Sequence, residues 1–382
     1  MIFVNQSLGY LSRDTILPFL DNNEEVLVIA GSDFDLELDN QKIRVIKCCN
    51  YNRKNSITKL LSWITFFFQT IYYINRFSKY HKEVFLVSNP PLLFFIPLLF
   101  KRQSYYLLIY DLYPDVFRIY LNSRSYKLFS FWERLNKRVF AQAKLVFTIG
   151  QNMKNAITAY VSEDKISVVY NWANQQTIPL VQNDDELMFS KLKNKFIITY
   201  SGNMGATHDF TILCKFIHLF QTLDSKVCFV FAGAGDKLQT IQKFVEDKKL
   251  SNVYFYSKLP YATFKYLLRL SNMGVVTLDE AMEHFSVPSK TATYLYEGLP
   301  ILNFSSKNSE VYTIVESYKI GINVIPNDLD STYNEIKNLI TNVNLYNHFR
   351  ENALLISNNI FSSFNSKKYY ELISESRQKY NI

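Results

Sequence analysis

The feature that most constrains the fold is a regular alternation of short apolar segments with longer amphipathic ones, in both halves of the chain. Short apolar segments bounded by turn residues are typical of buried strands, and the stretches between them have the length of helices. This alternation predicts sheets covered by helices. Because 382 residues exceed one ordinary core, we expect two α/β domains. The expected strands are residues 1–4, 25–31, 84–88, 105–110, 145–149, 196–200, 227–232, 253–256 and 273–278.

Residues 173–186 interrupt this alternation. They are polar, contain Pro179, include an acidic run that ends at Glu186, and show no hydrophobic period. Such a stretch is typical of a domain linker. The predicted parts of the chain are a first domain over residues 1–175, a second over residues 176–360, and a charged amphipathic helix over residues 361–382.

Composition and charge narrow the classes of partner. Hydrophobic residues make up 48% of the chain and charged residues 20%, which is the balance of a globular protein. The net charge of +8 suits an anionic partner, such as a nucleotide, a nucleic acid or an anionic membrane. Because the sequence has no basic stripe and no module for stacking single-stranded bases, we expect no nucleic-acid partner.

The cysteines and the apolar runs bear on location. Cys48, Cys49, Cys214 and Cys228 have no metal-ligand spacing, and the adjacent pair is a poor disulfide. We therefore expect no metal site and a reducing compartment. The first residues lack the features of a signal peptide, and no run reaches the roughly 20 apolar residues that cross a bilayer. The expected location is the cytoplasm, peripheral at the inner face of the cell membrane.

Residues 56–79 form an expected helix with an unusual apolar content, including Trp63, Phe66 and Phe67, and with basic residues at both ends. Aromatic side chains at the acyl boundary and cations at the head groups are typical of a helix in a membrane interface. A helix buried between a sheet and its neighbours would show the same pattern. The apolar run 92–100, which is followed by two cations, extends the patch under the membrane interpretation.

The segment 287–302 predicts an anion site. It opens on Pro288, offers Ser289 as an N-cap, ends a short helix at Gly298 and continues into an apolar strand. Amide groups and the dipole at a helix N-terminus favour negative charge, and Lys290 adds an ammonium. We interpret this helix as holding the diphosphate of a nucleotide. A capped surface helix with a solvated lysine is the alternative.

Other candidate site residues follow expected strands. Residues 201–205 contain two glycines between a strand and a helix, which allows the backbone to approach a phosphate closely. Residues 233–235 repeat the pattern after the next strand. Tyr110 and Asp111 lie at the carboxyl end of another strand, where α/β proteins bind their ligands.

Seven separated motifs of the chain resemble those of a known family. They are Asn89-Pro90-Pro91-Leu92, residues 110–115, Phe147-Thr148-Ile149, Tyr170-Asn171-Trp172, residues 200–209, residues 231–235 and residues 288–300. The family in which such motifs occur in the same order is glycosyltransferase family 4, whose members are retaining enzymes of the GT-B fold that use nucleotide sugars. The resemblance covers nearly the whole chain, and it implies two Rossmann-like α/β domains that face each other across a cleft.

The resemblance implies that the second domain binds the donor, that the first binds the acceptor, and that the last helix crosses back to the first domain. Lys290 and Asp111 are the candidate catalytic residues. The implied base contacts are residues 257–259, and the implied phosphate contacts are residues 202–205 with 289 and 290. The candidate donor-binding residues are Gly9, Ser201, Gly202, Asn203, Gly205, His208, Gly233, Ser257, Lys258, Leu259, His284, Pro288, Ser289 and Thr293. The candidate acceptor or membrane residues are Trp63, Phe66, Phe67 and Tyr110.

The chain departs from the family pattern at several positions. Asn203 and His208 stand where many members have an arginine and a lysine, and Phe285 and Thr293 stand where many have two glutamates. Tyr110 stands where relatives often have a histidine or glutamine. These departures resemble a subgroup that acts on lipid-linked sugars in surface polysaccharide assembly, and they leave the ribose contact open.

Retaining transfer without a metal requires stabilisation of the negative charge that develops on the β-phosphate, and each preorganised donor can supply a few kcal/mol. Lys290, the first-turn amides after Ser289 and the backbone of residues 202–205 are the candidate donors. The leaving phosphate can accept the proton of the attacking hydroxyl, so no protein base is required. Two residues have alternative roles: Asp111 orients the acceptor or the sugar, or caps a turn, and His208 binds phosphate or is an ordinary loop histidine. His284 is a candidate contact of the sugar.

The predicted function is transfer of a sugar from a nucleotide-diphosphate donor, with UDP expected, to a polyprenyl-diphosphate-linked saccharide. This reaction would belong to capsule, O-antigen or exopolysaccharide biosynthesis. A GT-B nucleotide-sugar epimerase and a noncatalytic GT-B partner subunit are the alternatives. Dependence on a lipid acceptor would argue against the epimerase, and a requirement for Lys290 would argue against the noncatalytic partner.

Overall fold

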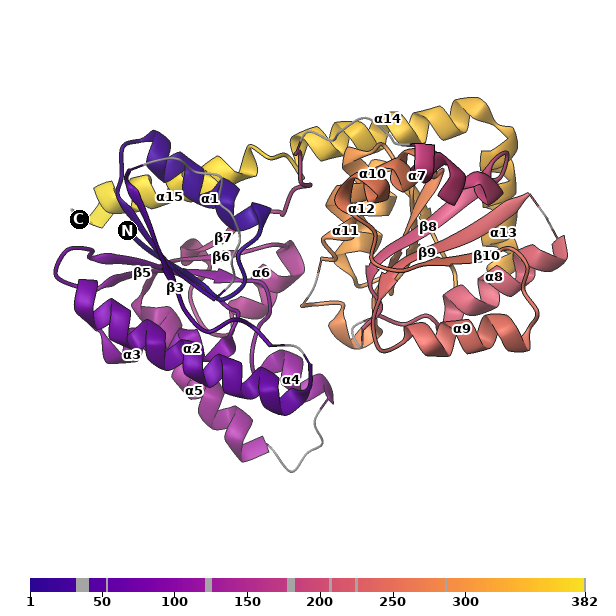
Figure 1. Cartoon of the computed structure of the whole chain (residues 1–382). Coiled ribbons are helices and arrows are strands. Elements are labelled where there is room, and N and C mark those ends of the chain that lie inside the picture. The colour runs from indigo at the N-terminus through magenta and orange to yellow at the C-terminus, as the bar shows by residue number, and fades with distance from the viewer. Residues whose placement is uncertain are drawn as a thin grey trace. The chain divides into compact units, whose positions relative to one another are not determined.

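The computed structural model describes residues 1–31, 41–52, 54–120, 126–176, 183–205, 208–223, 226–285 and 287–380 (Figure 1). The chain divides into two compact units. Unit 1 comprises Met1–Asn171 together with Ser363–Ile382, and unit 2 comprises Trp172–Ser362. The end of the chain thus belongs to the same unit as its beginning.

Unit 1 is built on a seven-stranded parallel sheet with the strand order β3-β2-β1-β4-β5-β6-β7. The inner strands are almost wholly apolar and buried, as expected where helices cover both faces of a parallel sheet. The strands are β1 (Ile2–Asn5), β2 (Val26–Ala30), β3 (Ile43–Lys47), β4 (Glu83–Val87), β5 (Ser104–Ile109), β6 (Ala143–Thr148) and β7 (Ile166–Val168).

Helices lie on both faces of this sheet (Figure 1). On one face α1 and α15 lie together, and Tyr369 of α15 packs edge-on against Phe85 and Phe147 of the sheet. On the other face α2, η1, α3 and α5 form a continuous layer, which we call the α2–α5 layer. The helices of unit 1 are α1 (Tyr10–Asp21), α2 (Ser56–Phe77), η1 (Pro91–Phe95), α3 (Ile96–Leu99), α4 (Asp115–Tyr120), α5 (Tyr126–Gln142), α6 (Gln151–Ile157), η3 (Glu163–Lys165) and α15 (Asn365–Tyr380).

The α2–α5 layer corrects part of the membrane interpretation. Trp63 is 7% exposed and Phe66 is fully buried, so these two side chains belong to the core and cannot enter a membrane. Phe67 is half-buried. The run 92–100 forms η1 and α3 and is largely buried, with Phe94 packed against Phe140 of α5. Within the described part of the chain, no helix combines the length and the apolarity that crossing a bilayer requires.

Unit 2 is built on a six-stranded parallel sheet with the strand order β10-β9-β8-β11-β12-β13. Strands β8 and β9 extend beyond their expected ends at residues 200 and 232. They continue because Gly202 pairs with Gly233 and Asn203 with Ala234, and glycines allow this close pairing. The strands are β8 (Phe196–Asn203), β9 (Val227–Ala234), β10 (Val253–Tyr256), β11 (Met273–Thr277), β12 (Ile301–Phe304) and β13 (Gly321–Asn323).

Both faces of the second sheet are also covered. Phe216 and Phe220 of α8, with Ile336 of α13, join the apolar core on one face, and Leu267 of α10 joins a separate cluster on the other. The helices of unit 2 are α7 (Asn183–Met188), η4 (Ser190–Leu192), α8 (Thr211–Leu223), α9 (Leu238–Asp247), α10 (Tyr261–Leu270), η5 (Glu280–Met282), α11 (Lys290–Tyr296), α12 (Glu310–Tyr318), α13 (Leu329–Thr341) and α14 (Val343–Asn359).

Candidate functional site

The candidate donor site lies at the carboxyl ends of the strands of unit 2. Strand β8 has β9 on one side and β11 on the other, so the strand order reverses at β8. Open α/β sheets bind ligands at this switch point, because the loops that follow the two neighbouring strands diverge there. Most of the sequence-predicted donor residues come from the end of β8 and the loop after it, from the loop after β11 and from α11.

Glycines allow close contact between the ends of β8 and β9 and the residues that follow them. Gly202 has a φ of +103°, and the space where a Cβ would stand is open. A Cβ on Gly233 would collide with the carbonyl oxygen of Gly202, and one on Gly235 would lie 2.6 Å from the backbone of Met204. Gly233 and Gly235 are therefore required for loop packing, whereas the free space is at Gly202.

Tyr294 of α11 fixes the start of the β8 loop. Its hydroxyl accepts a hydrogen bond from the Ser201 amide at 2.8 Å and lies 3.0 Å from the Ser201 hydroxyl. Ser201 and Tyr294 are both buried, and a Cβ on Gly274 would collide with the Tyr294 ring. Ser201 thus has a positioning role here, while Gly202 and Asn203 beyond it are exposed.

The ammonium of Lys290 is buried without a hydrogen-bond partner among the described residues. Its Nζ lies 3.6 Å from the centre of the Tyr200 ring, whose face attracts a cation. Burial lowers the pKa of Lys290 well below its ordinary value. A buried cation without a carboxylate partner is costly, and a bound anion would remove that cost.

His208 packs edge-on against the Tyr200 ring that Lys290 also contacts, with ring centroids 6.0 Å apart. Nδ1 of His208 is 2.7 Å from the carbonyl oxygen of Thr277, and the Lys237 ammonium donates to the His208 carbonyl. Burial, and then the Lys290 charge, lowers the pKa of His208 to about 4. This cluster of three basic side chains has the electrostatic character of an anion site. The roles of Tyr200, Tyr294 and Lys237 were not predicted from the sequence. Tyr200 could have been singled out, because it directly precedes Ser201-Gly202-Asn203.

Helix α11 differs from its expected form at its beginning. Ser289 has helical backbone angles and its hydroxyl makes no capping hydrogen bond, so the predicted N-cap is wrong. The helix has only seven residues, which limits what its dipole can contribute. Its end is as predicted, because Gly298 has a φ of +68°. Pro288 is buried and Thr293 is half-buried.

The remaining donor candidates of unit 2 lie in the loops after β10 and β11. Ser257 and Lys258 are exposed and Leu259 is half-buried in the loop after β10. His284 is exposed, and its Nε2 lies 3.1 Å from Glu283, which also accepts a hydrogen bond from Ser306. Glu283 therefore holds His284 toward the loop after β12.

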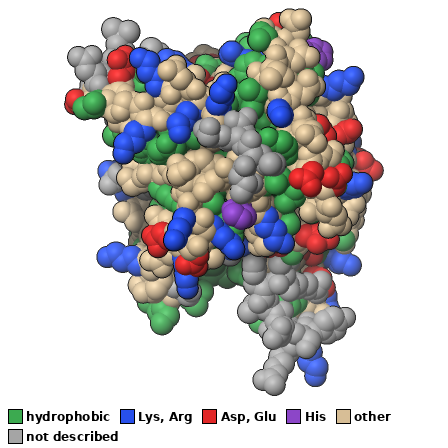
Figure 2. All heavy atoms as spheres, turned by 90° about the vertical axis from the view of Figure 1, so that its right-hand side faces the viewer, with side chains coloured by type: hydrophobic (Ala, Val, Ile, Leu, Met, Phe, Trp, Pro, Cys, Tyr) green, Lys and Arg blue, Asp and Glu red, His purple; other side chains and the backbone are tan. Residues whose placement is uncertain are grey.

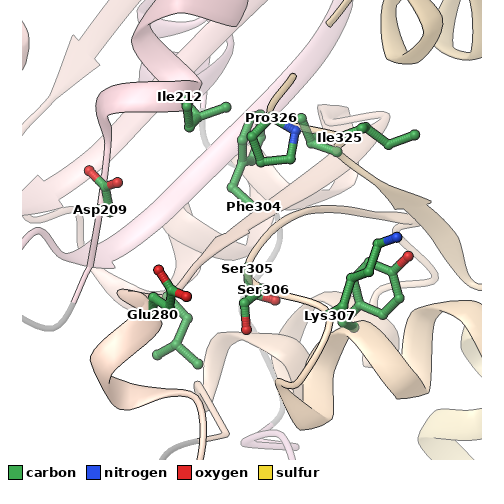
Figure 3. A pocket seen from close by; sticks show the side chains of 12 residues that line it. Asp209, Ile212, Glu280, Phe304, Ser305, Ser306, Lys307, Ile325 and Pro326 are labelled. Atoms are coloured by element: carbon green, nitrogen blue, oxygen red, sulfur yellow. The ribbon is translucent and has the colours of Figure 1, made fainter. Parts of the chain in front are cut away.

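A cavity of about 340 Å³ lies beside the basic cluster. Asp209 and Leu278, which directly follow His208 and Thr277, are among its walls. Figure 3 shows Asp209 and Glu280 on one side of the cavity and Lys307 away from them. Its apolar walls include Phe304 and Ile325, and none of the predicted donor residues lines it.

In unit 1 the predicted residues at the carboxyl end of β5 are held by Ser88. The Ser88 hydroxyl oxygen accepts hydrogen bonds from the amides of Tyr110, at 2.9 Å, and Asp111, at 3.2 Å. Burial raises the pKa of the Asp111 carboxyl, and the charge of Lys59 opposes that shift. Gly9 precedes α1 with extended backbone, and nothing would meet a Cβ there. Across the described ranges, we find no group of three side chains suited to a metal ion.

Comparison with known proteins identifies the fold and the domain. The chain superposes on the crystal structure of Anabaena Alr3699/HepE in complex with UDP and glucose with a TM-score of 0.72, at 14% identity, over 98% of this chain and 99% of that one. WaaG, a glycosyltransferase involved in lipopolysaccharide biosynthesis, gives a TM-score of 0.67 at 11% identity over 98% and 99%. The fold is therefore GT-B, with two Rossmann-like parallel sheets, as predicted. Residues 183–355 match the glycosyl transferases group 1 family, so unit 2 carries a glycosyl transferases group 1 domain.

Sequence relatives extend this likeness into the first unit. The chain is 25% identical to the probable glycosyltransferase WbjE of Pseudomonas aeruginosa over 295 residues, which are 74% of this chain and 72% of WbjE. It is 23% identical to the putative colanic acid biosynthesis glycosyl transferase WcaI of Escherichia coli over 49% of this chain and 47% of WcaI.

Proposed function

We propose that the protein is a retaining glycosyltransferase whose unit 2 binds a nucleotide-diphosphate sugar. The observation that carries the proposal is the Lys290 ammonium, buried and unpaired in the described structure, against the ring of Tyr200, which lies two residues before the open backbone at Gly202. A diphosphate bound there would gain a cation and exposed amides without displacing an existing salt bridge. UDP is the favoured nucleotide, because HepE, which has the same fold, was crystallised with UDP.

The proposed reaction needs no metal. The bond from the sugar anomeric carbon to the phosphate oxygen breaks, and Lys290 stabilises the negative charge that develops on that phosphate. The acceptor hydroxyl attacks from the same face, and its proton passes to the departing phosphate oxygen. Asp111 of unit 1 orients the acceptor by hydrogen bonding.

For the acceptor, we propose a polyprenyl-diphosphate-linked saccharide at the inner face of the cell membrane, in the assembly of a surface polysaccharide. The names of WcaI and WaaG, which refer to colanic acid and lipopolysaccharide, support this assignment. The departures at Asn203, His208 and Thr293, which resemble a subgroup acting on lipid-linked sugars, also support it.

Thermal unfolding in the presence of UDP, GDP, ADP and dTDP tests the donor site. A ligand that binds only the native state adds about 2.7 kcal/mol at a hundredfold excess over Kd. We expect one nucleotide to stabilise the wild type, Lys290→Met to remove that stabilisation, and Lys337→Met, at an exposed position of helix α13, to retain it. If no nucleotide stabilises the wild type, the proposal fails and the noncatalytic alternative is favoured.

A further inference from the structure

The net positive charge of the protein comes from unit 1. Unit 1 contains 25 Lys and Arg against 16 Asp and Glu, whereas unit 2 contains 17 against 18. Residues 41–82 alone contain nine Lys and Arg and no acidic residue. The face drawn in Figure 2, which is the right-hand side of Figure 1, carries both basic and acidic side chains. An anionic partner is thus expected to bind unit 1, around α2.

Helix α2 is apolar on two opposite sides. Trp63, Phe66 and Ile74 face the core, but Ile57 is 72% exposed and Phe68 is 62% exposed. Leu60 and Leu61 follow Ile57 by three and four residues, Phe68 follows Leu61 by seven, and Tyr72 follows Phe68 by four. These spacings place the exposed apolar residues on one face of the helix. We call this face the outer stripe of α2. Its members are Ile57, Leu60, Leu61, Phe68 and Tyr72.

An open hollow of about 520 Å³ lies where the chain after β3 meets the first turns of α2. Its lining combines apolar surface with amides, hydroxyls and the cation Lys54, and none of the described lining residues is a carboxylate. Leu61 belongs both to this lining and to the outer stripe, so the hollow and the stripe are continuous. The lining residues are Cys49, Asn50, Tyr51, Asn52, Lys54, Thr58, Leu61, Ser62 and Thr65.

Lys59 connects the hollow with the carboxyl end of β5. It lies in the same turns of α2 as Thr58 and Leu61, which line the hollow, and its Nζ is 4.8 Å from the centre of the Trp63 ring. The Trp63 ring in turn stacks on Tyr51, with centroids 6.2 Å apart. The Lys59 charge also reaches the Asp111 carboxyl and opposes the rise of its pKa. Lys59 therefore lies within electrostatic reach of the proposed acceptor-orienting carboxylate and next to the hollow that Lys54 lines.

We propose that the hollow binds the phosphate or diphosphate head of a lipid-linked acceptor and that the outer stripe of α2 binds the adjoining lipid. Lys54 and Lys59 neutralise the head, and the amides and hydroxyls face its saccharide. The proposal rests on the proposed function, whose acceptor it locates. A nucleic acid would suit the charge, but five large apolar side chains on the same helix suit a lipid interface.

Vesicle co-sedimentation of the full chain tests the proposal. The vesicles are phosphatidylcholine alone, phosphatidylcholine with polyprenyl diphosphate, and phosphatidylcholine with phosphatidylglycerol at equal charge. We expect the wild type to bind the polyprenyl diphosphate vesicles at least tenfold more tightly than the other two. Leu60→Ser/Phe68→Ser and Lys54→Gln/Lys59→Gln should each remove most of this gain. Val343→Ser/Leu355→Ser, which alters exposed apolar side chains of α14, should not.

Three results would overturn the assignment. They are equal binding to the phosphatidylglycerol vesicles, retention of the gain by both unit 1 variants, and an equal loss in the α14 control. Nucleotide-induced stabilisation, measured on the same samples, separates this proposal from the donor proposal. If the protein gains no affinity for polyprenyl diphosphate vesicles but is stabilised by a nucleotide, the acceptor site alone is rejected. If it binds those vesicles but no nucleotide stabilises it, the donor site alone is rejected.

Discussion

Nδ1 of His208 lies 2.7 Å from the carbonyl oxygen of Thr277, and this contact fixes the tautomer of the ring. A carbonyl only accepts hydrogen bonds, so Nδ1 carries the proton and Nε2 of the neutral ring does not. In the absence of an anion, His208 is therefore a buried neutral histidine whose free nitrogen can accept a hydrogen bond.

The burial of His208 predicts a loss of stability in acid. Its folded-state pKa of about 4 lies below the ordinary value of 6.5, so the unfolded chain binds more protons between these values. The free energy of unfolding is therefore unaffected by this group above pH 6.5, and it decreases by up to about 3 kcal/mol as the pH falls toward 4. Urea unfolding of the wild type and His208→Asn at pH 4.5 and 7 measures it. Identical pH dependence in the two proteins would contradict the prediction.

Nucleotide binding is expected to take up protons. A diphosphate beside Lys290 and His208 would favour their charged forms and raise the pKa of each from its lowered value. Affinity should consequently fall as the pH rises. Calorimetry at one pH in two buffers of different ionisation enthalpy gives the number of protons taken up on binding, which we expect to be positive in the wild type. Proton release in the wild type would contradict the arrangement.

Lys290→Met should stabilise the unliganded protein while it removes nucleotide binding. The substitution keeps the side-chain length and eliminates a buried ammonium without a described partner, at the loss of its contact with Tyr200. These opposing terms leave a net gain of about 1 kcal/mol. Urea unfolding without nucleotide measures it. A loss of stability would mean that the ammonium has a partner in the unliganded state.

Two glycines at the donor site should respond differently to alanine. Gly233→Ala places a Cβ against the Gly202 carbonyl oxygen, so the ends of strands β8 and β9 must separate. Gly202→Ala meets no atom, but its φ of +103° strains an L-residue by about 1–2 kcal/mol. We expect Gly233→Ala to lower the melting temperature more than Gly202→Ala does. A larger loss for Gly202→Ala would contradict this assignment of roles.

The sequence predicted those features that depend on local patterns. The alternation of strands and helices is local, as is the left-handed residue Gly298 at the end of α11. The burial of Lys290 is not, because it depends on Tyr200, 90 residues earlier. The absence of capping by Ser289 also follows from the way that the preceding chain enters α11.

Helix α2 shows a second limit of sequence patterns. It is apolar nearly all round, so its hydrophobic period does not decide which side faces the sheet. Trp63 and Phe66 are the more conspicuous candidates for a membrane, yet they are buried, and Leu60 and Phe68 are exposed instead. Only the packing of α2 against η1 and the sheet makes that choice.

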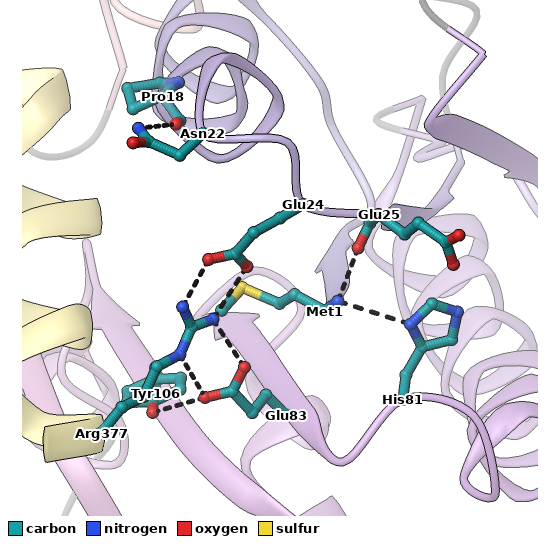
Figure 4. Close-up of polar contacts among 9 residues, drawn as sticks. All are labelled: Met1, Pro18, Asn22, Glu24, Glu25, His81, Glu83, Tyr106 and Arg377. Atoms are coloured by element: carbon teal, nitrogen blue, oxygen red, sulfur yellow. Dashed lines mark hydrogen bonds and ion pairs between the residues drawn. The ribbon is translucent and has the colours of Figure 1, made fainter. Parts of the chain in front are cut away.

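Arg377 should anchor the last helix to unit 1. Its guanidinium contacts both oxygens of Glu24 and lies 2.6 and 2.8 Å from the two oxygens of Glu83, which also accepts from Tyr106 (Figure 4). Arg377→Met leaves two carboxylates without their cation.

We expect Arg377→Met to destabilise unit 1 by about 2 kcal/mol, less than a fully buried pair because these groups are partly exposed. Hydrogen exchange followed by mass spectrometry measures this in α15 and in α14. Exchange should rise in α15, which belongs to unit 1, and stay unchanged in α14 of unit 2. Lys368→Met, at an exposed position of the same helix, is the matched control. Equal exchange in the two variants would show that the apolar contacts of Tyr369 hold α15 without the ion pairs.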